Sequence, residues 1–393
     1  TKKVAPADMP DYSIAGCQEP LIMGKESANT TNSWLNLAKV LELTLNDGKS
    51  LLSGEKLALG YQELGYTSFN AVATDLEAAF FRQLDWILKQ LEHAANGCTE
   101  AIAIQSVPFT SALMEGLKNG RDMRDIRHPG VTYHASGCLI HGLGVVADSL
   151  VAVKHGLAEM PDFTTTLLSA LQNNFKNNEA FRSYLQNLPK YGNDEAEPDE
   201  VAVRLAHLVS EKVHTLRNPA GNPFLPDYST PSTHLLYGYH VGATPDGRSA
   251  REMLGYGIDP RRESVHNGRI DQILSERKLA FGDFTGGYAS HLGISPEVFR
   301  NGTTTDEKMK IFSEKIIKPL FRFGNEVENA PFYVYFNIDS KMNLRKVLAE
   351  PKKYAPNGIY IMRIHGTFVN FLDLSPAIQE DIIARLDADE TVA

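Results

Sequence analysis

The sequence predicts an α/β protein in which parallel strands alternate with helices. One observation is that segments with apolar residues every three or four positions, the spacing of amphipathic helices, recur along the chain. A second is that short runs of β-branched and aromatic residues, typical of strands, lie between helical segments in the last third. Strands separated by helices of this length pair in parallel through crossover connections. We therefore expect a parallel sheet, and no internal repeat suggests another architecture.

The first half of the chain is predicted to be mainly helical. Apolar residues at helical spacing predict a helix over Ser33–Asn46, with Gly48 just past its end, and a second helix from about Thr74 to His93. Cys98 follows the second helix and is expected to be a loop residue or a small buried thiol. Further helical segments are expected over residues 162–188 and 200–216.

In the last third the sequence predicts alternating helices and strands. Ser375 stands at the N-cap position of the last of these helices. The segment FGDFTGGYASHLGIS precedes them, and it is expected to be a tight connection because no lysine follows Gly286 and Gly287 as in a phosphate-binding loop. The helices expected here are residues 306–323, 343–350 and 376–386, and the strands are residues 331–338 and 359–364.

Composition and charge exclude several functional classes. The chain has 393 residues, 42% of them hydrophobic, and a net charge of −9 from 39 basic and 48 acidic side chains, which is typical of a soluble globular protein with a large core. Because the sequence contains no basic stripe and no apolar run of about 18 residues, neither nucleic-acid binding nor a membrane span is expected. The first residues, TKKVAPADMP, lack the apolar core of a signal peptide, so we expect a cytoplasmic protein.

The cysteines and histidines do not form a metal-binding pattern. The three cysteines, Cys17, Cys98 and Cys138, are odd in number and far apart, which argues against a disulfide framework and against a zinc site. His234 and His240 have no third ligand at metal-binding spacing. We therefore expect reduced thiols and no bound metal, with Cys138 in the core.

A glycine between two strand-like runs is the first candidate site residue. Gly366 lies in the middle of Ile359–Leu374, IYIMRIHGTFVNFLDL, and no Pro, Asn or Asp adjoins it as in an ordinary exposed turn. The segment is predicted to form a backbone loop whose tip points inward. Gly366 then either supplies a positive φ or close backbone packing, as most glycines between strands do, or it holds a radical. Loss of a hydrogen atom from the glycine α-carbon gives a planar radical that no side chain distorts.

A thiol and a carboxyl group near the N-terminus form the second candidate. Cys17 and Glu19 are two residues apart in the loop Ala15–Pro20, AGCQEP, so in an extended backbone their side chains point the same way. Such a pair suits hydrogen-atom transfer at the sulfur followed by proton transfer at the carboxylate.

Four segments together resemble the glycyl radical enzymes, a family that includes pyruvate formate-lyase, glycerol dehydratase and choline trimethylamine-lyase. They occur in the family's order and at about its spacing: GCQEP from Gly16, GATPDGRSA from Gly242, MRIHGTF from Met362 and DLSPAIQEDIIAR from Asp373. The resemblance implies the C-terminal half of an α/β barrel, ten-stranded in the complete family fold. Its helices would lie outside, and the cysteine and glycine loops would meet inside.

The resemblance also implies the domain organisation. Residues 1–393 are expected to form a single catalytic region, with the cysteine loop at residues 15–20 and the glycine radical region at about residues 331–393. In the family the cysteine loop lies near the middle of a much longer chain, so the N-terminal half of a typical member is expected to be absent. A fragment, a truncated gene model or one part of a split enzyme with a companion N-terminal half would each explain this.

The resemblance assigns a role to each candidate residue. A radical on Gly366 would take a hydrogen atom from Cys17, and the resulting thiyl radical would take one from a small-molecule substrate. Glu19 is implied to be the general base, which removes a proton from a substrate hydroxyl and so weakens the bond to the neighbouring leaving group. The chain itself would bind no cofactor. A separate radical S-adenosylmethionine activating enzyme with an iron–sulfur cluster would install the radical, and the complete protein is expected to be a homodimer.

The residues around Cys17 favour one branch of the family. Members that resemble pyruvate formate-lyase have two adjacent cysteines and no carboxylate after them, whereas this chain has Gly16 before Cys17 and Glu19 after it. This pattern favours radical elimination by C–O, C–N or C–S cleavage, as in dehydratases. The alternatives are an arylacetate-type radical decarboxylase, a formate acetyltransferase-like C–C lyase and, from another class, an inactive structural homologue or a spare-part radical subunit.

Overall fold

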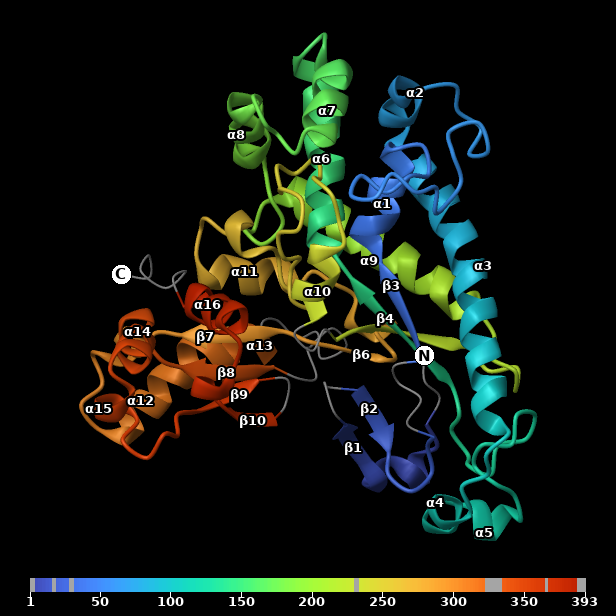
Figure 1. Cartoon of the computed structure of the whole chain (residues 1–393). Helices are drawn as coiled ribbons and strands as arrows, with labels where there is room; N and C mark the ends of the chain where they lie inside the picture. Colours follow the sequence, from blue (N-terminus) through green and yellow to red (C-terminus); the bar gives the residue numbers. More distant parts are fainter. Residues whose placement is uncertain are drawn as a thin grey trace.

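The centre of the molecule is a four-stranded parallel sheet (Figure 1). The computed structural model describes residues 4–15, 19–27, 32–229, 233–321, 334–364 and 367–386. Parallel pairing requires long crossovers, and helices fill them here, so the predicted α/β class is confirmed. The strands of the central sheet lie side by side in chain order: β3 (Ser33–Asn36), β4 (Ser136–His141), β5 (Phe224–Tyr228) and β6 (Gly287–Tyr288).

Three further pairs of strands accompany the central sheet. One is parallel, as predicted for strands separated by helices, and two are antiparallel hairpins. Figure 1 shows both hairpins on the side of the central sheet that is away from the helices drawn at its top. The parallel pair is β7 (His291–Ile294) with β8 (Tyr335–Ile338), and the hairpins are β1 (Tyr12–Ala15) with β2 (Glu19–Ile22) and β9 (Ile361–Ile364) with β10 (Thr367–Asn370).

The helices fall into two groups along the chain. Those of the first group, which lie in the connections between strands of the central sheet, are α1 (Leu37–Leu45), α2 (Phe69–Thr74), α3 (Leu76–Ala103), α4 (Pro108–Leu113), α5 (Gly116–Asn119), α6 (Leu143–Glu159), α7 (Phe163–Gln172), α8 (Glu179–Asn187), α9 (Ala196–Thr215), α10 (Thr233–Tyr239) and α11 (Arg269–Glu276). Those of the second group, which surround β7 to β10, are α12 (Thr305–Phe312), α13 (Lys318–Phe321), α14 (Lys341–Ala349), α15 (Pro351–Tyr354) and α16 (Pro376–Arg385).

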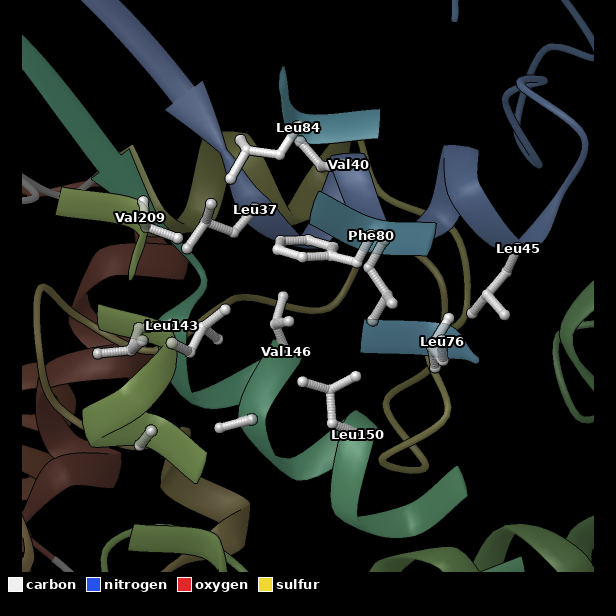
Figure 2. Packing of buried hydrophobic residues seen from close by; sticks show 14 of the residues in the cluster. Leu37, Val40, Leu45, Leu76, Phe80, Leu84, Leu143, Val146, Leu150 and Val209 are labelled. Carbon is white, nitrogen blue, oxygen red and sulfur yellow. The ribbon is translucent and has the colours of Figure 1, made fainter. Parts of the chain in front are cut away.

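One face of the central sheet packs against α1, α3, α6 and α9, and the main hydrophobic core lies between them. Side chains alternate between the two faces along a strand, and Leu35, Ile140 and Phe224 point to this helical face, where each is at most 1% exposed. Figure 2 shows the helical side of this core, including Phe80 of α3. Cys138 is also buried in it, as the sequence predicts.

The alternate residues of the same strands point to the opposite face, which we call the inner face. Three of them are neighbours in register across the sheet, because Trp34 pairs with Leu139 and Leu139 pairs with Asp227. Trp34 is 42% exposed, so the inner face is partly open to solvent while the helical face is closed. The inner face is therefore where the central sheet can meet another molecule.

The start of the first predicted helix is a strand instead. Residues Ser33–Asn36 form β3 because pairing with β4 satisfies their backbone hydrogen bonds in the sheet, and α1 begins only at Leu37. The Asn36 side chain then caps the helix by accepting a hydrogen bond from a backbone N–H of the first turn. Gly48 follows the helix with a φ of 73°, as its predicted position after the C-terminus requires.

Other predicted elements differ in length or type. Helix α3 is longer than predicted, so Cys98 lies within it and is exposed; the expected loop or buried position is wrong. The glycine-rich segment after α11 forms β6 and β7 rather than only a tight connection. Ser375 does stand at the N-cap of α16, but its side chain makes no capping hydrogen bond.

Long predicted helices are interrupted. The helix expected over residues 162–188 is divided into α7 and α8, because Asn174, Phe175 and Asn177 between them have positive φ angles. The helix expected over residues 306–323 is α12 and α13, joined by a π-helical turn at Ser313–Ile317. Residues 322–333 lie outside the described residues, together with part of this helix and of the next predicted strand. No helix in the described part of the chain is both long and apolar enough to cross a bilayer.

A buried carboxyl group in α6 makes the stability of the fold depend on pH. Asp148 is fully buried and accepts hydrogen bonds from the Tyr191 N–H (2.8 Å) and the Ser264 Oγ (3.0 Å). Burial raises the pKa of Asp148 from 3.8 to about 7. Because the folded pKa is the higher one, the bound proton stabilises the folded state fully below the unfolded pKa, and this stabilisation is lost as the pH rises towards 7.

We expect Asp148→Asn to become more stable relative to the wild type as the pH rises. The amide can keep both hydrogen bonds without a charge, so its advantage should grow by roughly 1.4 kcal/mol for each pH unit between the two pKa values. Denaturant unfolding at several pH values between 4 and 8 measures this difference. A difference that stays constant over this range would contradict the assignment, and the exposed Asp306→Asn should show no such trend.

Candidate active site

Glu19, the candidate residue that the structure describes, is the first residue of β2 and pairs with Ala15 of β1. Strands β1 and β2 pair up to Ala15 and Glu19, and residues 16–18, which include the predicted Cys17, connect them but lie outside the described residues. Strand β2 contacts β6 of the central sheet, and Glu19 is only 2% exposed. A carboxylate this deeply buried is costly and therefore marks a functional or structural role.

A second carboxyl group, which sequence analysis missed, lies near Glu19. Asp227 is on the inner face of β5 and is 0% exposed. Its Oδ1 accepts a hydrogen bond from the Ser229 N–H (2.7 Å), whereas its Oδ2 has no hydrogen-bond partner among the described residues. Burial, together with the negative charge of Glu19, raises the pKa of Asp227 well above its ordinary value.

Gly286, which directly precedes β6, explains how closely Asp227 is packed. A Cβ atom on Gly286 would lie 2.8 Å from the Asp227 Cβ and 2.9 Å from two carbonyl oxygens of β5, so only glycine allows this close approach. Gly286 is therefore needed for the close packing of the chain against β5 beside Asp227. The available sequence signal for Asp227 was a lone acidic residue in an otherwise apolar and aromatic strand, FLPDY.

A neutral histidine also lies on the inner face. His141, at the end of β4, is 0% exposed; its Nε2 is hydrogen-bonded to Thr233 Oγ1 (2.8 Å), and its ring stacks on Tyr237 with 4.1 Å between centroids. Burial, and then the nearby His234, lowers the pKa of His141 to about 3, so the ring is uncharged at neutral pH. With Trp34, these side chains give the inner face an aromatic, uncharged region beside the two carboxyl groups.

The glycine segment is the second hairpin. Strands β9 and β10 pair up to Ile364 and Thr367, and the Thr367 Oγ1 donates a hydrogen bond to the Ile364 carbonyl oxygen (2.9 Å). His365 and Gly366 connect these two residues but lie outside the described residues. The strands on either side of Gly366 therefore follow the pattern that the sequence predicts, while the position of Gly366 itself remains a prediction.

The side chain of Asn337 connects this hairpin to β8. Its Nδ2 donates to the Arg363 carbonyl oxygen (2.7 Å), and its Oδ1 accepts from the Arg363 N–H (3.1 Å). The same Nδ2 lies 3.1 Å from His291 Nε2 of β7, which makes this ring nitrogen the acceptor. The side-chain amide of Asn337 thus makes the hydrogen bonds to β9 that a neighbouring backbone would make in a sheet. It makes them at Arg363, three residues before Gly366.

We expect Asn337→Ala to destabilise the protein by about 1–3 kcal/mol, because it leaves the partly buried backbone groups of Arg363 without these partners. The same change should lower the amount of any radical that forms on Gly366, since the strand leading to it loses its attachment. Thermal unfolding and spin quantification measure the two effects. Asn301→Ala, at an exposed position, is the control, and equal radical yields in both variants would contradict a role in the hairpin.

A buried histidine connects α10 to the C-terminal helix. His234 of α10 contacts Asp381 of α16, with 3.1 Å between Nε2 and Oδ2. The ring of Tyr256 meets both His234 and His291 edge to face, with centroid distances of 5.4 and 6.3 Å. A cavity of about 320 Å³ adjoins Tyr256, His291 and Asp381. No three potential ligands among the described histidines, cysteines and acids lie close enough to hold a metal ion.

Comparison with known proteins identifies the family. The model of the pyruvate formate lyase-like family matches residues 1–238, which is more than half of the chain. The chain belongs to this family of glycyl radical enzymes. The matched segment includes Cys17, Glu19, His141 and Asp227 and ends before Gly366.

Several glycyl radical enzymes are similar over nearly the whole chain. Trans-4-hydroxy-L-proline dehydratase of Clostridioides difficile is 26% identical, over 95% of this chain and 45% of the relative. Isethionate sulfite-lyase of Bilophila wadsworthia is 26% identical, over 97% of this chain and 44% of the relative. Among solved structures, the glycerol-bound B12-independent glycerol dehydratase of Clostridium butyricum superposes with a TM-score of 0.84 at 29% identity, over 98% of this chain and 46% of that one.

The chain spans about half the length of the curated relatives that it matches. The high structural similarity over this part confirms that the chain has the α/β fold of the glycyl radical enzymes. The described residues include the strands that flank both predicted loops. Strands β1 and β2 flank the cysteine loop, and strands β9 and β10 flank the glycine loop.

Proposed function

We propose that the full-length protein is a glycyl radical lyase of the dehydratase type, which cleaves a C–O, C–N or C–S bond of a small polar substrate. The observation that carries this proposal is the burial of Glu19 at the end of the β1–β2 hairpin, two residues after Cys17 in the chain. Two relatives are named as a dehydratase and a sulfite-lyase, which supports elimination, and a third of equal identity is named as a formate acetyltransferase. Gly16 before Cys17 and Glu19 after it favour elimination over acyl transfer. The substrate class is therefore expected to be small molecules with a hydroxyl next to a leaving group.

Three residues share the chemistry in this proposal. A radical stored on Gly366 takes the hydrogen atom of the Cys17 thiol, and the Cys17 thiyl radical takes a hydrogen atom from a carbon that carries a hydroxyl group. Glu19 removes the proton of that hydroxyl, and the added negative charge drives the neighbouring leaving group out. The product radical then takes the hydrogen atom back from Cys17, so the radical is not consumed.

The protein surroundings contribute by excluding water and fixing positions. Glu19 and Asp227 are both inaccessible to solvent in the described part of the chain, which supports a dry site in which a radical survives and a carboxylate is a stronger base. The neutral His141 and the exposed face of Trp34 offer polar and apolar contacts to a substrate on the inner face. These groups bind and orient the substrate, while the radical removes the hydrogen atom from the substrate carbon.

The proposal includes partners that lie outside this chain. A radical S-adenosylmethionine activating enzyme installs the radical on Gly366, and no further cofactor is bound. We place the protein in the cytoplasm, as a homodimer in its complete form, with the remaining half of the catalytic region supplied by the same gene or by a companion chain.

An electron paramagnetic resonance spectrum of the full-length protein tests the proposal. After anaerobic treatment with the activating enzyme and S-adenosylmethionine, we expect a doublet from a radical coupled to one remaining α-hydrogen. Product analysis then separates the alternatives, because a decarboxylase releases carbon dioxide and a formate acetyltransferase-like enzyme transfers an acyl group. Absence of the doublet in the full-length protein would favour the inactive structural homologue.

A further inference from the structure

An elimination needs a proton donor as well as a base. When a hydroxyl group leaves, it must gain a proton to depart as water, and Glu19 in the role of base cannot give one at the same moment. We propose that Asp227 is the general acid of the reaction and protonates the departing oxygen, and that Asp227 and Glu19 together hold one exchangeable proton. This inference rests on the function proposed above.

The position of Asp227 meets the requirements for such an acid. It lies on the inner face of β5, in register with Leu139 of β4 and Gly287 of β6, and β6 is the strand that β2 contacts. Its Oδ2 is buried and has no hydrogen-bond partner in the described part of the chain, so this oxygen is available to carry a proton towards a ligand. Its Oδ1 is held by the Ser229 N–H, which orients the carboxyl group.

The charges around Asp227 favour its protonated form. Among the described residues, the titratable groups that interact electrostatically with Asp227 are Glu19 on β2 and the buried thiol of Cys138 on β4, and neither carries a positive charge. Two carboxylates cannot both ionise in such surroundings without a large cost. Burial and the charge of Glu19 keep the pKa of Asp227 well above its ordinary value, which favours the neutral, proton-carrying form of Asp227.

The reaction balances with these two groups alone. After Cys17 removes a hydrogen atom, Glu19 takes the proton of the substrate hydroxyl, the bond from the adjacent carbon to the leaving oxygen breaks with its electron pair, and Asp227 supplies the proton that turns this oxygen into water. Glu19 is then protonated and Asp227 ionised. Transfer of one proton from Glu19 to Asp227 restores the pair, and the product radical takes its hydrogen atom back from Cys17. The overall change is then loss of one water molecule from the substrate.

The resting state can be tested without a substrate. In the full-length protein at pH 7, infrared difference spectra between wild type and Asp227→Asn should contain the carbonyl stretch of a protonated carboxylic acid that belongs to Asp227. Glu19→Gln removes the repelling charge, so the same band should titrate away at a lower pH than in the wild type. Asp306→Asn, at an exposed position, should change neither. If no protonated band is assigned to Asp227, the proposal is wrong.

The catalytic step is tested after activation, with 1,2-propanediol, glycerol and trans-4-hydroxy-L-proline as probe substrates. Asp227→Asn should keep the Gly366 doublet and the KM of the accepted probe but lose kcat by about 100-fold or more. Asp227→Glu, which keeps an acidic group, should recover part of this loss, whereas a purely structural role would not be rescued by the longer side chain. A wild-type kcat in Asp227→Asn would overturn the proposal. A missing doublet in the wild type would overturn the proposed function instead, and the infrared result would still decide the protonation of Asp227.

Discussion

Replacing Gly366 with alanine is expected to abolish the electron paramagnetic resonance doublet and all turnover in the activated full-length protein. A planar α-carbon radical needs a residue without a side chain, and alanine adds a methyl group at the atom that must become planar and accessible to Cys17. In the wild type, exposure to air should cleave the backbone at Gly366, because oxygen attacks the radical carbon. Mass spectrometry of the fragments locates this cleavage, which should be absent in Gly366→Ala.

The control for this experiment is another glycine in the same chain. Gly282 has no atom within 4 Å of an added Cβ and no positive φ, so Gly282→Ala should keep the doublet, the turnover and the cleavage in air. A doublet of wild-type intensity in Gly366→Ala would place the radical elsewhere. In that case the other interpretation, in which Gly366 serves only backbone conformation or packing, would be the better one.

Separate replacements of Cys17 and Glu19 are expected to interrupt the reaction at different steps. Cys17→Ala should still form the Gly366 radical but show no turnover and no exchange of deuterium between substrate and protein, because the thiyl radical is missing. Glu19→Gln should keep this exchange, since hydrogen-atom transfer does not need the base, and should lose kcat by about 10²- to 10⁴-fold, which is the usual contribution of a general base. Electron paramagnetic resonance and isotope analysis of recovered substrate distinguish the two.

The exposed Cys98 provides the matched control for the thiol, and Cys98→Ala should behave as the wild type. Full turnover in Glu19→Gln would show that Glu19 is not the base. Any residual turnover in Cys17→Ala would remove the thiyl step from the proposed function. The two replacements therefore test the two assignments independently.

Local patterns in the chain were sufficient for part of the fold. The helical spacing of apolar residues correctly predicted α1, α3 and α9 as helices, and Gly48 correctly marked the end of α1, because only glycine easily adopts the positive φ found there. Boundaries were less accurate. The strand β3 was taken for helix because its four residues become a strand only through pairing with β4, which lies about a hundred residues later in the sequence.

For the candidate site, too, the sequence indicated some residues and only the structure revealed others. Cys17, Glu19 and Gly366 could be proposed from the sequence because each lies in a short motif whose members are close along the chain. Asp227, His141 and Asn337 could not, because nothing near them in sequence indicates which side chains they meet. In the sequence, Asp227 is only one acidic residue in a predicted strand. The register of β4, β5 and β6 places it on the inner face, and the contact of β2 with β6 brings the charge of Glu19 near it.

By itself, the sequence determined the α/β class and the family, because helix periodicity and short motifs are properties of neighbouring residues. The same motifs led to the proposal that Gly366, Cys17 and Glu19 carry the radical and the base. Only the tertiary structure decided that a second buried carboxyl group lies close enough to Glu19 to be affected by its charge, and that an asparagine amide holds the strand before Gly366. The reason is physical. The burial of a charge and the partner of a hydrogen bond depend on groups that folding brings together from distant strands.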